Sequence, residues 1–246
     1  VCRDNERINM TKFIVLTLFK EMFEGFLGTS VIKRAIDEEK VSVDVIDIRD
    51  FSLNKHKKVD FPPYGGGSGM VMSCEPLSRA IDYATDILKK YEKEIKIIYL
   101  SPRGKLLNYN LSNSLANDNS NYILVCVHYE GIDERIIEEY NILEISIGDY
   151  VLTGGELASQ VLMDSVIRLI PGVISSESLI EESHTNYLLE YPQYTKPDLF
   201  RGRVVPEILK SGNHKKIAEY RKNESIRITK INRPDLLKKY NDLNNK

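Results

Sequence analysis

Hydrophobic residues in the first three-quarters of the chain form short continuous runs that alternate with stretches of helical spacing. Two of the runs, IKIIYL and YILVCV, are apolar at nearly every position. Such runs are typical of strands that are buried on both faces of a parallel sheet. The pattern predicts β-strands at residues 12–19, 41–48, 95–100, 122–127 and 143–152.

Apolar residues with helical spacing occupy the intervals between these strands. The predicted helices are residues 24–40, 75–90, 132–140 and 157–170. Strands that alternate with helices predict an α/β fold, in which helices cover both faces of one sheet. The Asn-rich stretch NYNLSNSLANDNSN does not fit the alternation, and we interpret it as a low-complexity tract.

The pattern changes after Pro171-Gly172, a strong stop signal for the preceding helix. The next stretch, VISSESLIEESHTNY, is polar and aperiodic, which predicts a linker or lid between domains. Short basic helices follow it. We therefore expect an α/β domain at residues 1–172, a linker at 173–185 and a small helical domain at 186–246.

The composition is that of a soluble globular protein, with 42% hydrophobic and 28% charged residues. The longest apolar runs are far shorter than the roughly 20 residues that a transmembrane helix needs, so we expect no membrane association. The first residues do not have the pattern of a signal peptide. Three widely spaced cysteines and four scattered histidines predict neither a disulfide framework nor a zinc site, and favour a cytoplasmic location.

Charge is distributed unevenly, although the net charge is only −2. Residues 201–246 contain 13 Lys and Arg against 5 Asp and Glu, whereas residues 130–190 contain 13 acidic and 2 basic residues. A basic module on an acidic body suggests a polyanionic partner such as a nucleic acid. A solvated, lysine-rich helical face explains the basic module equally well on charge alone.

Three strand ends carry Gly- or Pro-bearing motifs: YLSPRG, HYEGIDER and SIGDYVLTGGEL. Open α/β sheets bind ligands in the crevice beyond the carboxyl ends of their strands, so these motifs predict a pocket. Three ordinary β–α turns are the alternative. A further Gly-rich stretch, FPPYGGGSGM, matches neither a Walker A loop nor a dinucleotide fingerprint and indicates a loop with close backbone packing.

Taken together, the motifs PYGGGSGM, YLSPRG, HYEGIDER, SIGDYVLTGGEL and YPQYTKP resemble those of the bacterial tRNA (guanine-N1)-methyltransferases of the SPOUT superfamily. The motifs occur in the expected order over residues 12–237. The resemblance implies a parallel-sheet SPOUT fold with a C-terminal trefoil knot at about residues 97–172, and a helical C-terminal domain that binds tRNA. It also implies a homodimer with the active site at the subunit interface.

The resemblance implies an activity and two cofactors. The expected reaction transfers a methyl group from S-adenosylmethionine to N1 of the guanine that adjoins the tRNA anticodon on its 3′ side, with Mg²⁺ present. The implied cofactor-binding residues are Leu100, Ser101, Pro102, Val127, Tyr129, Glu130, Gly131, Ile147, Gly148, Asp149, Tyr150, Val151, Leu152, Gly154 and Gly155.

Methyl transfer to guanine N1 needs a base that removes the N1 proton and a group that stabilises charge at O6. The resemblance assigns the base to Glu182, its electrostatic partner to Arg168 and a second acidic position to Glu190. Without the resemblance, Arg168 would be interpreted as the ion-pair partner of Asp164 four residues earlier. Glu182 would be interpreted as part of a solvated linker.

The chain departs from the family pattern at several of these positions. Glu182 and Glu190 replace Asp, and Val127-His128 replaces Gly-Arg or Gly-His. A carboxylate displaced by about 1 Å can slow a reaction about 100-fold. Two alternatives therefore stay open: a SPOUT RNA methyltransferase with another target nucleotide, and a tRNA-binding homologue with impaired catalysis.

Overall fold

The structure of the 246-residue chain is a computed structural model, which describes residues 10–175, 179 and 182–244. The chain divides into two compact units, Val1–Ile174 and Ser175–Lys246. We call them unit 1 and unit 2 and describe each by itself. Among the described residues, no helix has both the length and the apolar composition needed to cross a membrane.

A five-stranded sheet with the order β2-β1-β6-β5-β7 forms the centre of unit 1. Every neighbouring pair in it is parallel. The parallel sheet confirms the predicted α/β class. Its strands are β1 (Thr11–Thr17), β2 (Val41–Asp47), β5 (Ile95–Leu106), β6 (Asn121–Val125) and β7 (Leu143–Ser146), and a separate antiparallel pair is formed by β3 (Asp60–Phe61) and β4 (Val71–Met72).

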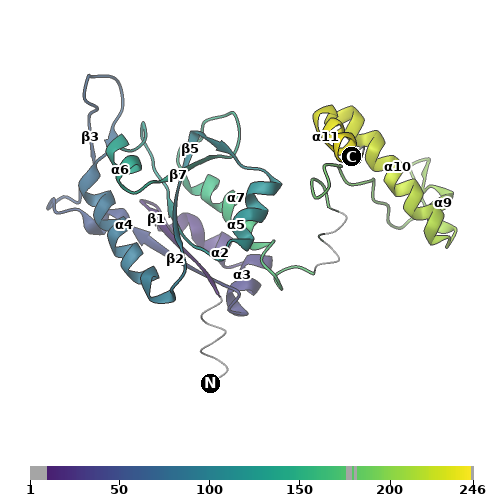
Figure 1. The fold of residues 1–246 in the computed structure, drawn as a ribbon, viewed down its shortest axis with the longest axis horizontal. Coiled ribbons are helices and arrows are strands. Elements are labelled where there is room, and N and C mark those ends of the chain that lie inside the picture. Colours follow the sequence, from purple (N-terminus) through teal and green to yellow (C-terminus); the bar gives the residue numbers. More distant parts are fainter. Residues whose placement is uncertain (1–9, 176–178, 180–181, 245–246) are drawn as a thin grey trace. The chain divides into compact units, whose positions relative to one another are not determined.

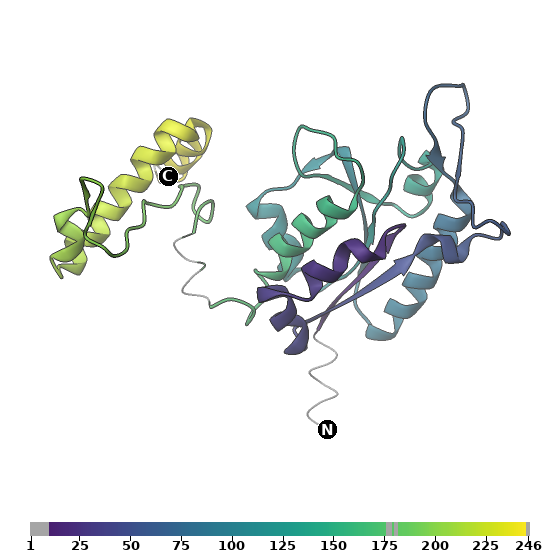
Figure 2. The ribbon, with the colours of Figure 1, turned by 180° about the vertical axis from the view of Figure 1, so that it is seen from behind.

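Helices cover both faces of the sheet (Figures 1 and 2). On one face, α4 and α6 bury side chains such as Leu77 and Ile136; on the other, α3, α5 and α7 bury Ala35, Leu115 and Leu162. These two apolar layers are the core of unit 1. The helices of unit 1 are η1 (Lys20–Phe23), α2 (Glu24–Leu27), α3 (Ser30–Asp37), η2 (Ile48–Phe51), α4 (Cys74–Leu88), η3 (Lys89–Tyr91), α5 (Tyr109–Asn117), α6 (Glu134–Glu139) and α7 (Glu156–Ile167).

The predicted strand at residues 143–152 is wrong in its second half. The strand β7 ends at Ser146, and residues 147–155 form an irregular loop before α7. Gly148 has a φ of +155°, and the apolar side chains that suggested a strand line a pocket, as described below. The apolar pattern of the sequence here thus reflects a pocket wall and not a sheet.

One predicted helix is wrong in its extent, and one helix of the structure was not predicted. The expected helix at 24–40 breaks after α2, because Ser30 adopts a φ of +54° and the Thr29 hydroxyl donates back to the Gly25 carbonyl at 2.7 Å. The Asn-rich tract forms the helix α5, capped where the Asn108 side chain accepts from the Leu111 amide at 3.1 Å. Asn side chains supply caps as readily as loops, which composition alone does not distinguish.

The strand β5 is longer than predicted and contains an irregularity at the YLSPRG motif. Both Leu100 and Lys105 are in register with Ile145 of β7, so the residues between them are additional to the ladder. At Gly104 a Cβ atom would lie 2.5 Å from the backbone of Ile145. The close approach of the two backbones at Gly104 lets the extra residues project beyond the sheet.

Unit 2 is mainly helical. The chain segment around residues 189–191 packs against α10, the longest helix of unit 2. The buried Thr229 hydroxyl accepts a hydrogen bond from the Leu189 amide at 2.8 Å, and the Arg221 guanidinium lies 4.7 Å from the centre of the Tyr191 ring. The elements of unit 2 are β8 (Leu199–Phe200), β9 (Arg203–Val204), α9 (Glu207–Lys210), α10 (His214–Asn232) and α11 (Pro234–Asn244).

We expect Gly104→Ala to destabilise the protein by about 1–3 kcal/mol, because the added methyl group meets backbone atoms of β7 that cannot rotate away. Thermal unfolding followed by circular dichroism measures the change. Gly25→Ala is the matched control, since a Cβ there has no neighbour within 4 Å and Ala favours a helix. An unchanged midpoint for Gly104→Ala would contradict the packing.

Candidate functional site

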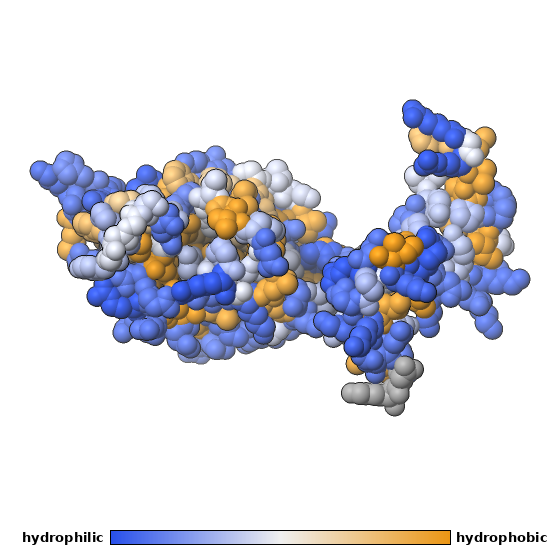
Figure 3. Space-filling model, turned by 90° about the horizontal axis from the view of Figure 1, so that it is seen from above, coloured by the Kyte–Doolittle hydropathy of each residue, from blue (hydrophilic) through white to orange (hydrophobic). Residues whose placement is uncertain are grey.

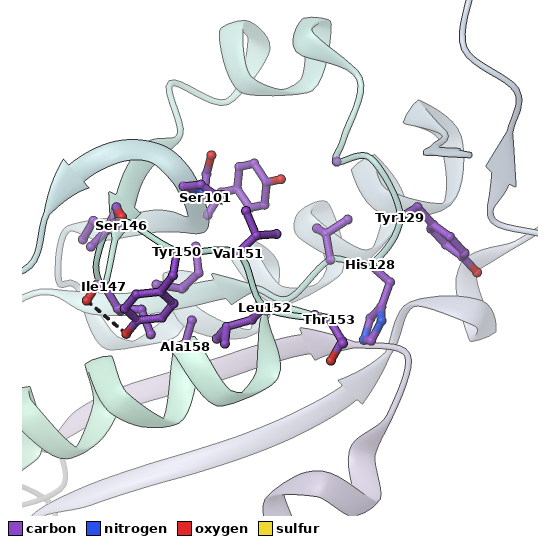
Figure 4. A pocket seen from close by; sticks show the side chains of 18 of the residues that line it. Ser101, His128, Tyr129, Ser146, Ile147, Tyr150, Val151, Leu152, Thr153 and Ala158 are labelled. Atoms are coloured by element: carbon purple, nitrogen blue, oxygen red, sulfur yellow. Dashed lines mark hydrogen bonds between the residues drawn. The ribbon is translucent and has the colours of Figure 1, made fainter. Parts of the chain in front are cut away.

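A pocket opens at the carboxyl ends of β5, β6 and β7 (Figure 4). It encloses about 780 Å³ of space, part of which is open to solvent. Three chain segments wall the pocket, one from each strand end, as expected for a ligand site of a parallel sheet.

The first segment is the irregular part of β5. Leu100 and Ser101 are almost fully buried, and the Arg103 amide donates to the Ser101 hydroxyl at 3.3 Å. Pro102 follows at the pocket wall. The additional residues of β5 thus place a short apolar and hydroxyl-bearing turn over the sheet edge.

The second segment, residues 127–131, follows β6 and bends sharply. Tyr129 has a φ of +66° and Gly131 one of +119°. Two backbone hydrogen bonds tie the bend to the end of the Gly-rich stretch: the Glu130 amide donates to the Met70 carbonyl at 2.9 Å, and the Met72 amide donates to the Gly131 carbonyl at 3.0 Å. The Gly-rich stretch is therefore a supporting layer of the site.

Gly69 contacts the one carboxylate in this wall. A Cβ at Gly69 would lie 2.5 Å from Oε1 of Glu130. The sequence of the stretch predicted only a closely packed loop, and nothing in its spacing indicated which side chain it packs against. The structure assigns that neighbour as Glu130, which lines the pocket.

The third segment, residues 147–155, supplies most of the apolar surface. Ile147, Val151 and Leu152 line the pocket, and the Tyr150 hydroxyl donates to the Ile147 carbonyl at 3.3 Å, which closes the loop on itself (Figure 4). The Tyr150 amide also donates to the Gly148 carbonyl at 2.9 Å. Hydrogen bonds within the loop thus hold its conformation without a ligand.

The Gly pair that ends this loop lies against the second segment. A Cβ at Gly155 would be 3.0 Å from the Cα of Cys126, and one at Gly154 would be 2.4 Å from the His128 ring. The Gly155 amide donates to the Val127 carbonyl at 3.0 Å. Both glycines are therefore required by packing between two loops of the protein, besides any approach to a ligand.

The pocket contains almost all of the predicted cofactor-binding residues. Of that set only Asp149 is not among the lining residues. His128 and Thr153 lie within the quoted motifs but were not selected, because nothing in the sequence showed which side chains face inward. The lining residues that the sequence did not identify are Tyr99, His128, Ile145, Ser146, Thr153 and Ala158.

The charges around the pocket restrict its ligand. Among the described residues that line it there is no Lys or Arg, and Glu130 is the one acidic residue. Phosphate groups are normally held by cationic side chains or helix N-termini. The pocket therefore favours a ligand with an apolar part and a positive charge. Burial raises the pKa of the Cys126 thiol well above its usual range, so this thiol is not a nucleophile at neutral pH.

Comparison with known proteins decides the family. The model of the family described as tRNA (Guanine-1)-methyltransferase TrmD matches residues 11–239. The chain belongs to the TrmD family. Curated tRNA (guanine-N(1)-)-methyltransferases that resemble this TrmD-family chain come from Caldanaerobacter subterraneus subsp. tengcongensis (53% identical, 93% of this chain and 92% of the relative), Ruminiclostridium cellulolyticum (53%, 93% and 97%) and Clostridioides difficile (50%, 94% and 99%).

The residues predicted for catalysis in this TrmD-family chain belong to different units. Arg168 is the C-cap residue of α7 in unit 1, where its amide donates to the Asp164 carbonyl at 3.2 Å. Glu182 and Glu190 belong to unit 2. Arg168 is thus part of one unit, and the two carboxylates are part of the other.

Within unit 2, Glu182 lines a second pocket together with Tyr191, His214 and Arg221. Glu190 accepts a hydrogen bond from the Gln193 side chain at 2.7 Å. The second pocket thus combines a carboxylate with basic and aromatic side chains. No group of three or more His, Cys, Asp or Glu side chains that could hold a metal ion occurs in the part of the chain that the structure describes.

Proposed function

We propose that this chain methylates N1 of the guanine that adjoins the tRNA anticodon on its 3′ side, with S-adenosylmethionine as the methyl donor. The observation that carries the proposal is the pocket of unit 1. Its walls consist of the family's three strand-end motifs, brought together by the parallel sheet. A substrate tRNA accords with a cytoplasmic enzyme.

The pocket fits S-adenosylmethionine in its chemistry. Ile147, Val151 and Leu152 offer an apolar wall for the adenine, and the loops offer backbone groups for its polar edge. The ligand carries no phosphate and has a positively charged sulfonium, which matches a lining with Glu130 and without Lys or Arg among its described residues. When bound, S-adenosylmethionine supplies the methyl group.

The chain's own residues would then handle the proton and the developing charge on the guanine. Glu182 would accept the N1 proton, and Arg168 would be the electrostatic partner that stabilises negative charge at O6. Glu190 would act as the second acidic group near the base. The mixture of Glu182, His214 and Arg221 in one pocket of unit 2 supports this assignment, because it combines a base with groups suited to a nucleotide.

Mg²⁺ is the second cofactor that we propose. Magnesium usually keeps several water ligands and binds only one or two protein carboxylates together with substrate oxygens. A single carboxylate such as Glu130 at the pocket wall is compatible with that mode. The described residues contain no closed metal cage, which accords with an ion that enters with the RNA.

We also propose that the trefoil knot of the SPOUT superfamily forms within residues 97–172. The strand order supports it: the chain leaves β5 for β6 and then returns past β5 to β7 on the opposite side. Helix α5 connects β5 to β6, and helix α7 follows β7. The two helices lie on the same face of the sheet and are joined by a hydrogen bond of 3.1 Å between the Ser112 and Ser165 hydroxyls.

A homodimer with the active site at its interface is supported by apolar side chains at the surface of unit 1. Leu157 and Val161 are about half exposed and lie one helical turn apart on α7. Phe19 and Met22, from the adjacent chain turn, are also exposed, and the Gln160 side chain donates to the Met22 carbonyl at 2.8 Å. Apolar side chains (orange) are visible on the surface of unit 1 in Figure 3. An apolar helix face beside a ligand pocket suits a subunit interface.

Unit 2 would bind the tRNA phosphates. On α10 and α11 the exposed basic residues include Lys215, Lys216, Lys222, Lys238 and Lys239. Such contacts release counterions from the RNA, and binding weakens as the salt concentration rises because that release becomes less favourable.

Methyl transfer to tRNA transcripts tests the proposal. A transcript with guanine 3′ of the anticodon should accept a labelled methyl group at N1, and the same transcript with adenine there should not. Methylation of another nucleotide would show a different target specificity. Binding of both tRNA and S-adenosylmethionine without transfer in a single turnover would show an impaired homologue. Either result would overturn the proposal.

We predict that Glu182→Ala lowers single-turnover methyl transfer by about 100-fold or more, because the N1 proton loses its acceptor. S-adenosylmethionine affinity should stay unchanged, since Glu182 does not line the pocket of unit 1. Glu182→Asp should lose less activity than Glu182→Ala, because it retains a carboxylate, although one displaced by about 1 Å. Undiminished turnover in Glu182→Ala would refute the role of this residue.

Gly69→Ala should lower the rate of methyl transfer about tenfold or more, because the added Cβ displaces the Glu130 carboxylate by roughly 1 Å. Gly66→Ala is the matched control. Gly66 has nearly the same φ, +80° against +85°, but a Cβ there meets nothing within 4 Å. Equal losses in the two variants would mean that backbone strain, and not the contact with Glu130, limits the rate.

A further inference from the structure

A fully buried carboxylate lies behind the cofactor pocket and has no part in the chemistry proposed above. Glu156, the first residue of α7, has 0% of its surface exposed. Burial of a carboxylate is unfavourable unless hydrogen bonds compensate for lost hydration. The amino-terminal end of a helix favours a negative charge. In addition, the Glu156 side chain makes hydrogen bonds to two specific side chains.

Glu156 joins two strand ends. The Thr17 hydroxyl, at the end of β1, donates to Oε1 of Glu156 at 2.7 Å. Nε2 of His128, just beyond β6, lies 2.8 Å from Oε2. Because a carboxylate only accepts, this bond requires a hydrogen on Nε2 of His128. The carboxylate therefore bridges β1, α7 and the second pocket segment.

Phe19 closes these contacts into a ring. Its amide donates to the Thr17 hydroxyl at 2.9 Å, and its side chain packs edge-on against the His128 imidazole with 4.7 Å between ring centres. The four residues Thr17, Glu156, His128 and Phe19 thus contact one another in a cycle, which we call the Glu156 ring. Interlocked contacts of this kind fix one geometry more firmly than separate pairs do.

The Glu156 ring holds two walls of the pocket at a set distance. His128 belongs to the segment 127–131, and Glu156 directly follows the segment 147–155. A Cβ at Gly154 would lie 2.4 Å from Nε2 of His128 and 2.6 Å from Oε2 of Glu156. The ring thus also accounts for the absence of a side chain at position 154.

We propose that Glu156 is a positioning residue which, through His128, sets the separation of the two pocket walls and thereby the affinity for S-adenosylmethionine. It reaches neither the ligand nor the reacting atoms, because it is buried beneath the loops. The inference rests on the proposed function only in naming the ligand. Its effect belongs to cofactor binding and not to the methyl-transfer step.

The first test measures S-adenosylmethionine binding by titration calorimetry. Glu156→Ala should weaken binding about tenfold or more, because it leaves His128 and Thr17 without their acceptor. The KM for S-adenosylmethionine should rise in parallel, while kcat at saturating cofactor stays within about twofold. Glu156→Gln should recover much of the affinity, since its amide oxygen can still accept. Glu139→Ala, which removes an exposed carboxylate from α6, should bind as the unmodified protein does.

The second test uses the steric contact at Gly154 and does not depend on Glu156→Ala folding. Gly154 does not have a left-handed φ, so Ala is restricted there only by its neighbours. Gly154→Ala should weaken binding about tenfold. His128→Ala removes the ring but leaves Oε2 of Glu156 2.6 Å from the added Cβ, so the loss in the double variant should be smaller than the sum of the two single losses.

These outcomes separate the inference from the proposed function. Additive losses in the double variant, or unchanged affinity in both Glu156→Ala and Gly154→Ala, would overturn the role of the Glu156 ring. Unmodified protein that does not bind S-adenosylmethionine would instead overturn the proposed function. A fall in kcat without a change in affinity would show that Glu156 acts in the reaction and not in positioning.

Discussion

The close approach of the Gly154-Gly155 turn to the end of β6 is the constraint on which the pocket depends. The Gly155 amide bonds to the Val127 carbonyl, and neither glycine has room for a Cβ. The contact brings the 147–155 loop over the second segment and starts α7 with its first carboxylate buried. The pocket walls, the buried Glu156 and the exposed apolar face of α7 all follow from where that turn lies.

Much of unit 1 could be predicted from hydrophobic periodicity, because β1 and β6 are buried on both faces and leave a clear apolar signal. The loop at 147–155 could not be predicted in this way, because apolar side chains that line a pocket have the same sequence pattern as those of a strand. The helix α5 was missed because its Asn residues face solvent while Leu115 reaches the core.

The candidate site was predicted better than the elements that carry it, and the reason is physical. Strand-end motifs of a parallel sheet meet at one edge whatever the loop conformation, so all the cofactor-binding residues that the resemblance implied except Asp149 line the pocket, while six other lining residues were not identified. The contacts that hold the site together were not predictable. Thr17 and Glu156 are 139 residues apart in the chain, and neither belongs to a pattern that indicates a buried hydrogen bond. The same holds for Gly69 and Glu130.

The central claim is that the three strand-end segments of unit 1 hold S-adenosylmethionine. Amide hydrogen exchange of the unmodified protein, with and without the cofactor, tests it most directly, because exchange reports each segment separately. We expect slower exchange on cofactor addition at residues 100–101, 127–131 and 147–155, and little change in α4. Protection confined to other parts of the chain, or none at saturating cofactor, would contradict the account.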